Sequence, residues 1–192
     1  NISANLVWAN DSKTLFYVDK DPQTLLPYQI YRHQYGTDRK QDVKIFEEND
    51  DRFYTWMGKS KSEDYILVSI ESSTTSESRL IDANAPEKPM VIFSARQEGR
   101  EYDIDHFNGE FYIRSNHESE LFGLYKTASI DKPWETVIAP QKEVDLEGFD
   151  LFNRWLVVEE RKQGLVSLRQ IDWKTGQSTN VTFDDPVYMA WL

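Results

Sequence analysis

The sequence predicts an all-β protein, a partial β-propeller of about four blades with four antiparallel strands in each. Three observations lead to this fold class. Aromatic residues make up 14% of the 192 residues, and aromatic side chains favour strands. No long stretch repeats apolar residues at the i, i+3, i+4, i+7 spacing of an amphipathic helix. Short apolar runs recur at nearly even intervals, which is typical of blades repeated along a chain.

The apolar runs are the first element of the repeat, and each is predicted to be a fully buried strand. With Phe16, Ile66, Tyr112 and Leu156 as markers, successive runs lie 50, 46 and 44 residues apart. The runs occupy residues 15–18, 65–68, 111–113 and 155–158. Each follows a turn cluster, namely NDSK, KSKSED, HFNG and LFNR in chain order. Within the third cluster, Asn108-Gly109 is a strong signal for a type I′ hairpin turn.

Further strands are predicted on both sides of these runs. The strands ahead of the turns are expected at residues 6–9, 53–57, 102–106 and 146–151. Behind the runs, apolar and polar residues alternate, which indicates strands with one drier and one wetter face. These segments are residues 28–33, 43–45, 165–169 and 179–183. Lys44 and Asn180 would lie on outer edge strands, where a polar side chain discourages edge-to-edge pairing.

The repeat divides the chain into blade-like units. We expect one incomplete propeller segment over residues 1–192, with units at about 1–48, 49–97, 98–144 and 145–186 and a fifth begun at 187–192. A β-sandwich also has short strands, but nothing in it requires a four-strand period. Because residue 1 is not Met, the chain is expected to begin within a longer protein. A partial ring leaves apolar faces on its end blades, so self-association is expected.

Composition narrows the possible partners. The net charge is −11, from 33 acidic and 22 basic residues, and nucleic-acid binding is not expected because it needs clustered Lys and Arg. An acidic field can instead attract cationic peptides. There is no cysteine, which fits a reducing, cytoplasmic location. No apolar run reaches the ~18 residues of a membrane span, so no membrane partner is expected.

Motifs of catalysis are not found in the sequence. The nucleophile elbow G-x-S-x-G is missing, since Ser60 and Ser178 each have a Gly on one side only. Gly58-Lys59-Ser60 lacks the first Gly of a phosphate-binding loop. Ser129-x-x-Lys132 is short enough to occur by chance. We therefore predict no catalytic, cofactor-binding or metal-binding residue, and no cofactor, in this chain.

Histidine and carboxylate groups have structural interpretations. His33 and His106 fall on predicted strands, where a hydrogen-bonded structural role is expected, and His117 lacks a second zinc ligand four residues on. The acidic cluster Glu47–Asp51 is interpreted as a solvated turn, with a cation-attracting rim as the functional alternative. Glu159-Glu160 is followed at once by Arg161-Lys162, which suggests local ion pairing.

Several segments together resemble the oligopeptidase B (protease II) branch of the prolyl oligopeptidase family of serine peptidases. They are LVWANDS (6–12), TLLPYQIYRH (24–33), EENDD (47–51), ESSTTSESRLIDA (71–83), FYIRSN (111–116), LFGLY (121–125), LEGFDLFNRWLVVEERKQGLVSLRQI (146–171) and FDDPVY (183–188). The resemblance covers essentially the whole chain. It implies the central part of an N-terminal seven-bladed propeller, roughly the third to sixth blades.

The resemblance also implies a function. In that family the propeller caps an α/β-hydrolase domain that carries the Ser, Asp and His, and it restricts access to short peptides. Oligopeptidase B prefers cleavage after Arg or Lys. No triad residue, and no acidic residue that reads the basic side chain, maps onto this sequence. The expected partners are therefore the parent's hydrolase domain and, for the full enzyme, short basic peptides.

Two alternatives remain at this stage. One is a stand-alone propeller that acts as a protein-interaction scaffold, because fold alone does not fix function. The other is a closed four-bladed enzyme propeller, which would need inward-facing carboxylates or histidines around its axis. A downstream G-x-S-x-G in the parent reading frame would favour the peptidase, and an early stop codon would favour the scaffold.

Overall fold

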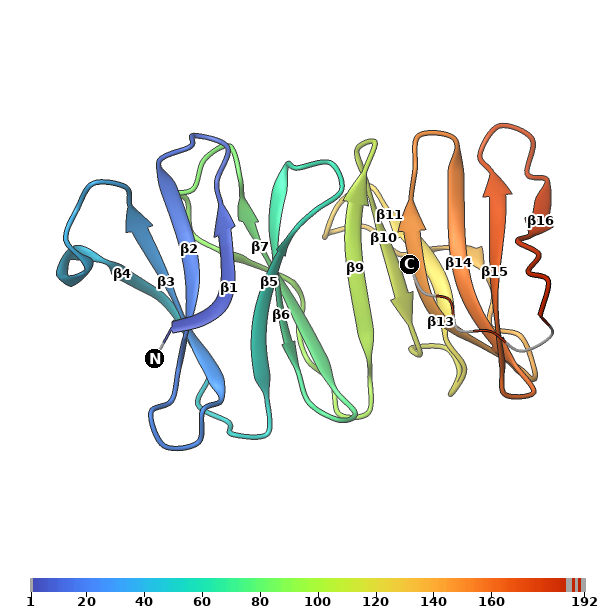
Figure 1. Ribbon diagram of the computed structural model, residues 1–192, viewed down its shortest axis with the longest axis horizontal. Coiled ribbons are helices and arrows are strands. Elements are labelled where there is room, and N and C mark those ends of the chain that lie inside the picture. The colour runs from blue at the N-terminus through green and yellow to red at the C-terminus, as the bar shows by residue number, and fades with distance from the viewer. Residues whose placement is uncertain (1, 186–187, 189, 191–192) are drawn as a thin grey trace. The chain divides into compact units, whose positions relative to one another are not determined.

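A computed structural model describes residues 2–185, 188 and 190. It contains four four-stranded antiparallel sheets (Figure 1), and the only helical element among the described residues is the three-residue 3₁₀ turn η1 (Arg39–Gln41). None of the helical segments described could span a membrane. The all-β fold class and the four-strand unit are thus confirmed. The chain forms two compact units, Asn1–Phe111 and Tyr112–Leu192.

The first two sheets lie in the N-terminal unit, and each is ordered as its strands follow in the chain. The first contains β1 (Ile2–Trp8), β2 (Thr14–Lys20), β3 (Pro27–Gln34) and β4 (Val43–Glu47). The second contains β5 (Tyr54–Lys59), β6 (Tyr65–Glu71), β7 (Ser76–Asp82) and β8 (Val91–Ser94). The first strand of each of these two sheets, β1 and β5, was predicted from the sequence, although β1 begins nearer the N-terminus than expected.

The third and fourth sheets follow the same up-and-down order. The third contains β9 (Tyr102–Phe107), β10 (Glu110–Ser115), β11 (Gly123–Thr127) and β12 (Glu135–Ile138), and the boundary between the two units falls within β10. The fourth contains β13 (Val144–Leu151), β14 (Trp155–Lys162), β15 (Leu165–Asp172) and β16 (Ser178–Asn180). The predicted fifth unit at 187–192 falls mainly on residues outside the described part of the chain. We propose that each sheet with its following linker forms one blade.

The predicted apolar runs fall on β2, β6, β10 and β14. Ile66 to Ile70 are all buried, so β6 is covered on both faces as expected. Full burial was wrong for Leu15 and Tyr65, the half-buried first residues of the first two runs. It was also wrong for the fourth run, since Leu156 and Val158 are buried but Trp155 and Val157 are only half-buried. The β14 strand therefore has one dry face rather than two. At the third turn, Asn108 and Gly109 have φ of 50° and 80°, and this confirms the positive-φ hairpin.

The core of the N-terminal unit lies between its two sheets. Phe16 and Val18 from β2 belong to the same buried cluster as Ile66, Val68 and Ile70 from β6. Alternate residues of each strand point to one face, so these side chains mark the faces that the two sheets turn toward each other. The sharing of one core by neighbouring sheets is the packing that a propeller requires.

Polar side chains join the same two sheets at their inner strands. The Asn5 side chain lies beside Met57 of β5, where its Oδ1 accepts from the Met57 N–H at 2.6 Å and its Nδ2 donates to the Met57 carbonyl at 2.7 Å. The strand register of β1 shifts between Ile2 and Leu6, which frees Asn5 for this bidentate contact. At one end of the strands, Asn10 donates to the Glu63 carbonyl and to Asn84.

Candidate functional site

The best candidate for a functional surface is one rim of the second sheet, where three loops meet. They are the linker of residues 48–53 between β4 and β5, the hairpin loop of residues 72–75 between β6 and β7, and the linker of residues 95–101 between β8 and β9. We call this surface the linker rim. In the up-and-down topology these three connections are all at the same end of the sheet, so they lie close together. The rim includes the acidic cluster identified in the sequence.

The acidic linker is a turn held together by its own carboxylates. Glu48 Oε1 accepts from the backbone N–H groups of Asn49 and Asp50, at 3.0 and 2.9 Å. Asp50 in turn accepts from the backbone and guanidinium of Arg52, with the shortest contact at 2.7 Å. These Arg52 contacts lower the pKa of Asp50 to about 2. Local bonding of this kind is the mechanism by which Asp and Glu favour turns.

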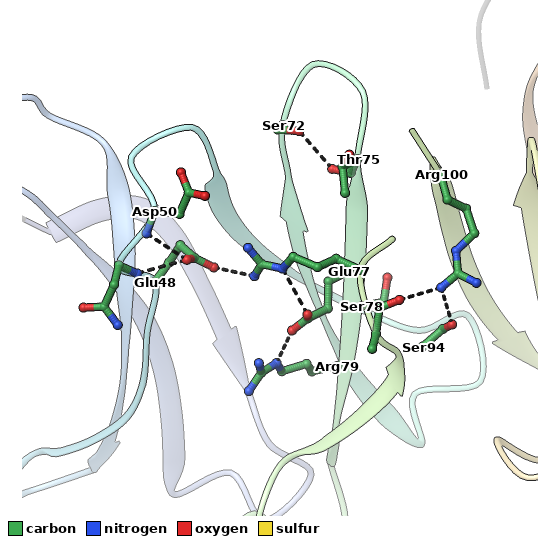
Figure 2. A network of polar contacts seen from close by, with 12 residues as sticks. Glu48, Asp50, Ser72, Thr75, Glu77, Ser78, Arg79, Ser94 and Arg100 are labelled. Atoms are coloured by element: carbon green, nitrogen blue, oxygen red, sulfur yellow. Dashed lines mark hydrogen bonds and ion pairs between the residues drawn. The ribbon is translucent and has the colours of Figure 1, made fainter. Parts of the chain in front are cut away.

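Behind the linker lies an ion network that no sequence pattern predicted. Arg96 bonds Glu48 at 2.5 Å and Glu77 at 3.2 Å, and Arg79 bonds the other oxygen of Glu77 at 2.6 Å. Figure 2 shows the Glu77 carboxylate between the two guanidinium groups. The Glu77 side chain is only 6% exposed. The network therefore links the first linker, β7 and the second linker through a buried carboxylate.

Aromatic rings hold the two arginines in place, and the charge of the arginines keeps this carboxylate ionised. Arg96 lies 4.1 Å from the Phe53 ring centroid, and Arg79 lies 4.6 Å from that of Phe46, distances at which cation–π attraction is effective. Burial by itself raises the pKa of Glu77, but Arg79 and Arg96 outweigh it, so the pKa lies below its ordinary value. Desolvation and ion pairing act in opposite directions here, and ion pairing is stronger.

Tyr102 ties β9 to the outer half of the second sheet. Its hydroxyl accepts from the Ser78 N–H at 2.6 Å and donates to the Ser94 carbonyl. These two residues are paired with each other next to the register shift between β7 and β8, so the phenol bridges the two strands where their ladder is irregular. The Arg100 Nη2 bonds Ser94 Oγ at 2.7 Å (Figure 2). These contacts hold the linker between β8 and β9 against the second sheet.

Two hollows flank the linker on this rim. One has a volume of about 230 Å³ and the other about 350 Å³. The first is lined by Asp21, Thr24, Leu26, Tyr28, Glu47, Glu48, Asn49, Asp50, Asp51 and Phe53. The second is lined by Asp51, Arg52, Phe53, Tyr54, Ser72, Ser73, Thr74, Thr75 and Glu98. Several of these carboxylates already have partners, so the rim is a structured acidic surface rather than a simple solvated turn.

His33 and His106 are hydrogen-bonded, as expected of histidines on strands, and His117 packs against an aromatic ring. His33 Nδ1 lies 2.6 Å from Asp42 Oδ1, and the other Asp42 oxygen accepts from the Tyr17 hydroxyl at 2.7 Å. Burial and this hydrogen bond raise the pKa of Tyr17 to about 12. His117 packs edge-on against Tyr125, with ring centroids 4.3 Å apart. Within the described residues, no three His, Cys, Asp or Glu side chains are placed to hold a metal ion.

His106 has a serine and a carboxylate beside its ring. Ser62 Oγ lies 2.8 Å and Asp64 Oδ2 3.7 Å from the same ring atom, Nδ1. A catalytic relay needs the nucleophile and the orienting carboxylate on opposite ring nitrogens. Burial lowers the pKa of His106, against a smaller opposite effect of Asp64. The group therefore serves as a buried hydrogen-bonded link, and this geometry does not suit nucleophilic catalysis.

Two other sequence interpretations are resolved by the structure. Lys59, part of the phosphate-loop pattern, lies at the end of strand β5, and its ammonium bonds the Trp8 carbonyl and Asn10. Local pairing of Glu159-Glu160 with Arg161-Lys162 was wrong for two of these residues. Glu160 instead pairs with Arg169 on β15, and Arg161 pairs with Glu147 on β13 at 2.6 Å. Adjacent strand residues point to opposite faces, so neighbours along β14 cannot meet.

Comparisons with known proteins agree on one family. The family described as "prolyl oligopeptidase, N-terminal beta-propeller domain" matches residues 1–192. The chain is 38% identical to dipeptidyl aminopeptidase BI of Pseudoxanthomonas mexicana and 29% identical to protease 2 of Moraxella lacunata, and covers 27% of each. The alignments include 100% and 97% of this chain.

Solved structures show the same fold. Oligopeptidase B from Trypanosoma brucei, in a closed form with covalently bound antipain, superposes with a TM-score of 0.87. It is 22% identical, and the match covers 97% of this chain and 28% of that one. Oligopeptidase B from Leishmania major gives a TM-score of 0.81 at 24% identity, with 94% and 27% covered. The chain thus spans about a quarter of the length of the proteins it matches.

Proposed function

Because this chain belongs to the prolyl oligopeptidase family, as part of its N-terminal β-propeller domain, we propose that it is a non-catalytic filter segment of a serine oligopeptidase. The parent enzyme resembles oligopeptidase B and cleaves short peptides after Arg or Lys. Its Ser, Asp and His lie in an α/β-hydrolase domain outside these 192 residues. This chain contributes no catalytic residue, cofactor site or metal site.

The observation that carries the proposal is the family match over the whole chain, together with the chemistry of its polar groups. Ser62 and His106 are locked in a geometry unsuited to a relay. The carboxylates Glu48 and Glu77 are neutralised by arginines. What remains for the segment is to admit or refuse substrate. Packed sheets block a folded protein, whereas a short unfolded peptide can pass through an opening in the propeller. Opening and closing of the propeller against the hydrolase domain can then limit turnover.

The acidic linker rim suits this role. The carboxylates of Asp21, Asp51 and Glu98, which line its two hollows, would raise the local concentration of peptides that contain Arg or Lys, through an attraction that weakens with salt. The relatives named as a protease and an aminopeptidase favour this function over a stand-alone interaction scaffold. A stand-alone interaction scaffold would not make the rate of hydrolysis depend on the length of the substrate, whereas a filter would.

The proposal is tested with the parent enzyme and a series of peptides that carry one Arg and increase in length. We expect hydrolysis of the short peptides after Arg, and no hydrolysis of a folded protein with the same sequence in a surface loop. The same protein after unfolding and fragmentation serves as the control. Equal rates for the folded protein and the short peptides would exclude a filter.

Self-association of the isolated segment is a second proposal. The first sheet exposes Ile2, Leu6 and Trp8 on β1, with Leu6 52% exposed, and apolar side chains in such numbers favour association. We expect light scattering of the purified chain to show an average mass that rises with concentration. A monomeric mass at every concentration, up to about millimolar, would contradict this expectation.

A further inference from the structure

A groove between the first and second sheets lies outside the linker rim and has no part in the proposed function. It has a volume of about 310 Å³, which is at the lower end of the range for small-molecule sites. Arg32 and Ile45 line it from the first sheet, and Arg79 and Ile81 line it from the second. The loop Pro86–Met90, between β7 and β8, forms its remaining wall.

The floor of the groove is apolar. Phe16 and Ile81 beneath it are buried in the shared core, and Ile45 and Met90 pack on that core while remaining partly exposed. Pro86 and Pro89 add rigid apolar surface at the mouth. Covering such surface removes apolar area from water and favours binding of an apolar group.

Arg79 brings to this groove a guanidinium group whose hydrogen-bond donors are only partly used. Its Nε donates to Glu77 at 2.6 Å, and its guanidinium lies over Phe46. Among the described residues, no acceptor bonds its two terminal nitrogens. A guanidinium has five N–H donors, so four point to no protein acceptor. Glu77 bonds the Arg79 guanidinium, as Figure 2 shows, and Phe46 lies under its plane. Because both hold the plane in place, the fork is pre-organised for a carboxylate.

Arg32 on the opposite wall has partners that can be exchanged. Its Nη1 donates to the Pro86 carbonyl at 3.1 Å, and its Nη2 pairs with Glu87 at 2.5 Å. The Glu87 side chain is 69% exposed, and exposed ion pairs contribute little stability. The carboxylate of a ligand can therefore displace the Glu87 carboxylate from Arg32 with little loss of stability. Lys88, by contrast, is paired with Asp82.

We propose that this groove binds a small carboxylate attached to a compact apolar group. The carboxylate accepts from the terminal nitrogens of Arg79 in a bidentate arrangement, and the apolar group covers Ile45 and Met90. Since the two walls come from different sheets, the ligand holds the first and second sheets together. The chemistry is shared by the C-terminal residue of a peptide and by a medium-chain fatty acid.

Calorimetric titration of the purified chain tests the proposal with N-acetyl-leucine and octanoate as probes, one for each source. We expect at least one to bind, at least tenfold more tightly than its uncharged amide, which corresponds to about 1.4 kcal/mol. Arg79→Gln should lower the affinity tenfold or more. Arg161→Gln, in the other unit and paired with Glu147, is the matched control and should change nothing.

A second variant separates loss of the site from loss of the fold. Met90→Trp fills the groove from its partly exposed wall and leaves the Arg79–Glu77 pair intact, so it should abolish binding while the unfolding curve stays close to that of the wild type. Three results would each overturn the proposal. They are equal affinity for acid and amide, unchanged binding by Met90→Trp, and no binding of either acid up to about 20 mM.

Discussion

Replacing Glu77 by Ala should destabilise the N-terminal unit by about 3–5 kcal/mol, the range found when one partner of a buried ion pair is removed. The reason is that Arg79 would lose the carboxylate with which it is paired, and Arg96 would keep Glu48 but lose its second carboxylate. Urea unfolding followed by tryptophan fluorescence measures this loss. Glu147→Ala, which removes a more exposed partner of Arg161, should cost no more than about 1 kcal/mol.

The pH dependence of the same variant gives the sign of the electrostatic effect. The pKa of Glu77 is lower in the folded protein than its ordinary value of 4.5, so the stabilisation is fully present above pH 4.5. It is lost as the pH falls through the lowered pKa, because the unfolded state then binds the proton first. The difference between the wild type and Glu77→Ala should therefore shrink below pH 4.5. A cost of Glu77→Ala no larger than that of Glu147→Ala would show that the network does not hold the sheets.

The second large effect is expected in the core between the first two sheets. Phe16→Ala should cost about 3–5 kcal/mol, through lost burial and the cavity that remains. Phe16 is fully buried in the cluster that both sheets share. Leu6→Ala is the matched control, because Leu6 is on the adjacent strand, lies opposite Tyr17 and is 52% exposed. That variant should cost about 1 kcal/mol, since only half of its apolar surface is buried.

Comparison of the two variants by urea unfolding tests whether the sheets pack face to face through this side of β2. Similar costs would mean that the Phe16 side of the sheet is no better covered than the Leu6 side. In that case the packing that defines a blade would be absent between these sheets.

Strands whose burial depends on apolar residues could be predicted from the sequence. The runs around Phe16, Ile66 and Tyr112 are continuous apolar segments bounded by turn residues, and the Asn108-Gly109 pair fixed the position of one hairpin. The period then followed from the spacing of the runs. These signals are local in the sequence. They predict the strands correctly because an apolar side chain can be buried against any apolar neighbour and does not need one particular residue elsewhere in the chain.

The strand β7 shows what could not be predicted. Its sequence, SESRLID, is polar, and yet Ser76, Glu77 and Ser78 are buried. Their burial depends on Arg96 and Tyr102, which lie 19 and 24 residues further along the chain. A polar strand of this kind is stable only with such distant partners. The ion network behind the linker rim was missed for the same reason, since Glu48 and Arg96 are 48 residues apart.

The pairing of charges on β14 follows the same rule. Local sequence suggested Glu160 with Arg161, but strand geometry turns these two side chains to opposite faces and brings each to a different neighbouring strand. Only the register of the sheet determines which residues become partners.

We propose that these 192 residues support and guard a reaction whose catalytic groups lie elsewhere in the parent protein. The most direct test is hydrolysis of a fluorogenic amide of an Arg-containing dipeptide by two preparations, the purified chain and the parent enzyme. The chain should first show a cooperative unfolding transition, so that inactivity is not the result of misfolding. We predict hydrolysis by the parent and none above background by the chain. Turnover by the chain alone, removed by a serine-directed inhibitor, would contradict the account.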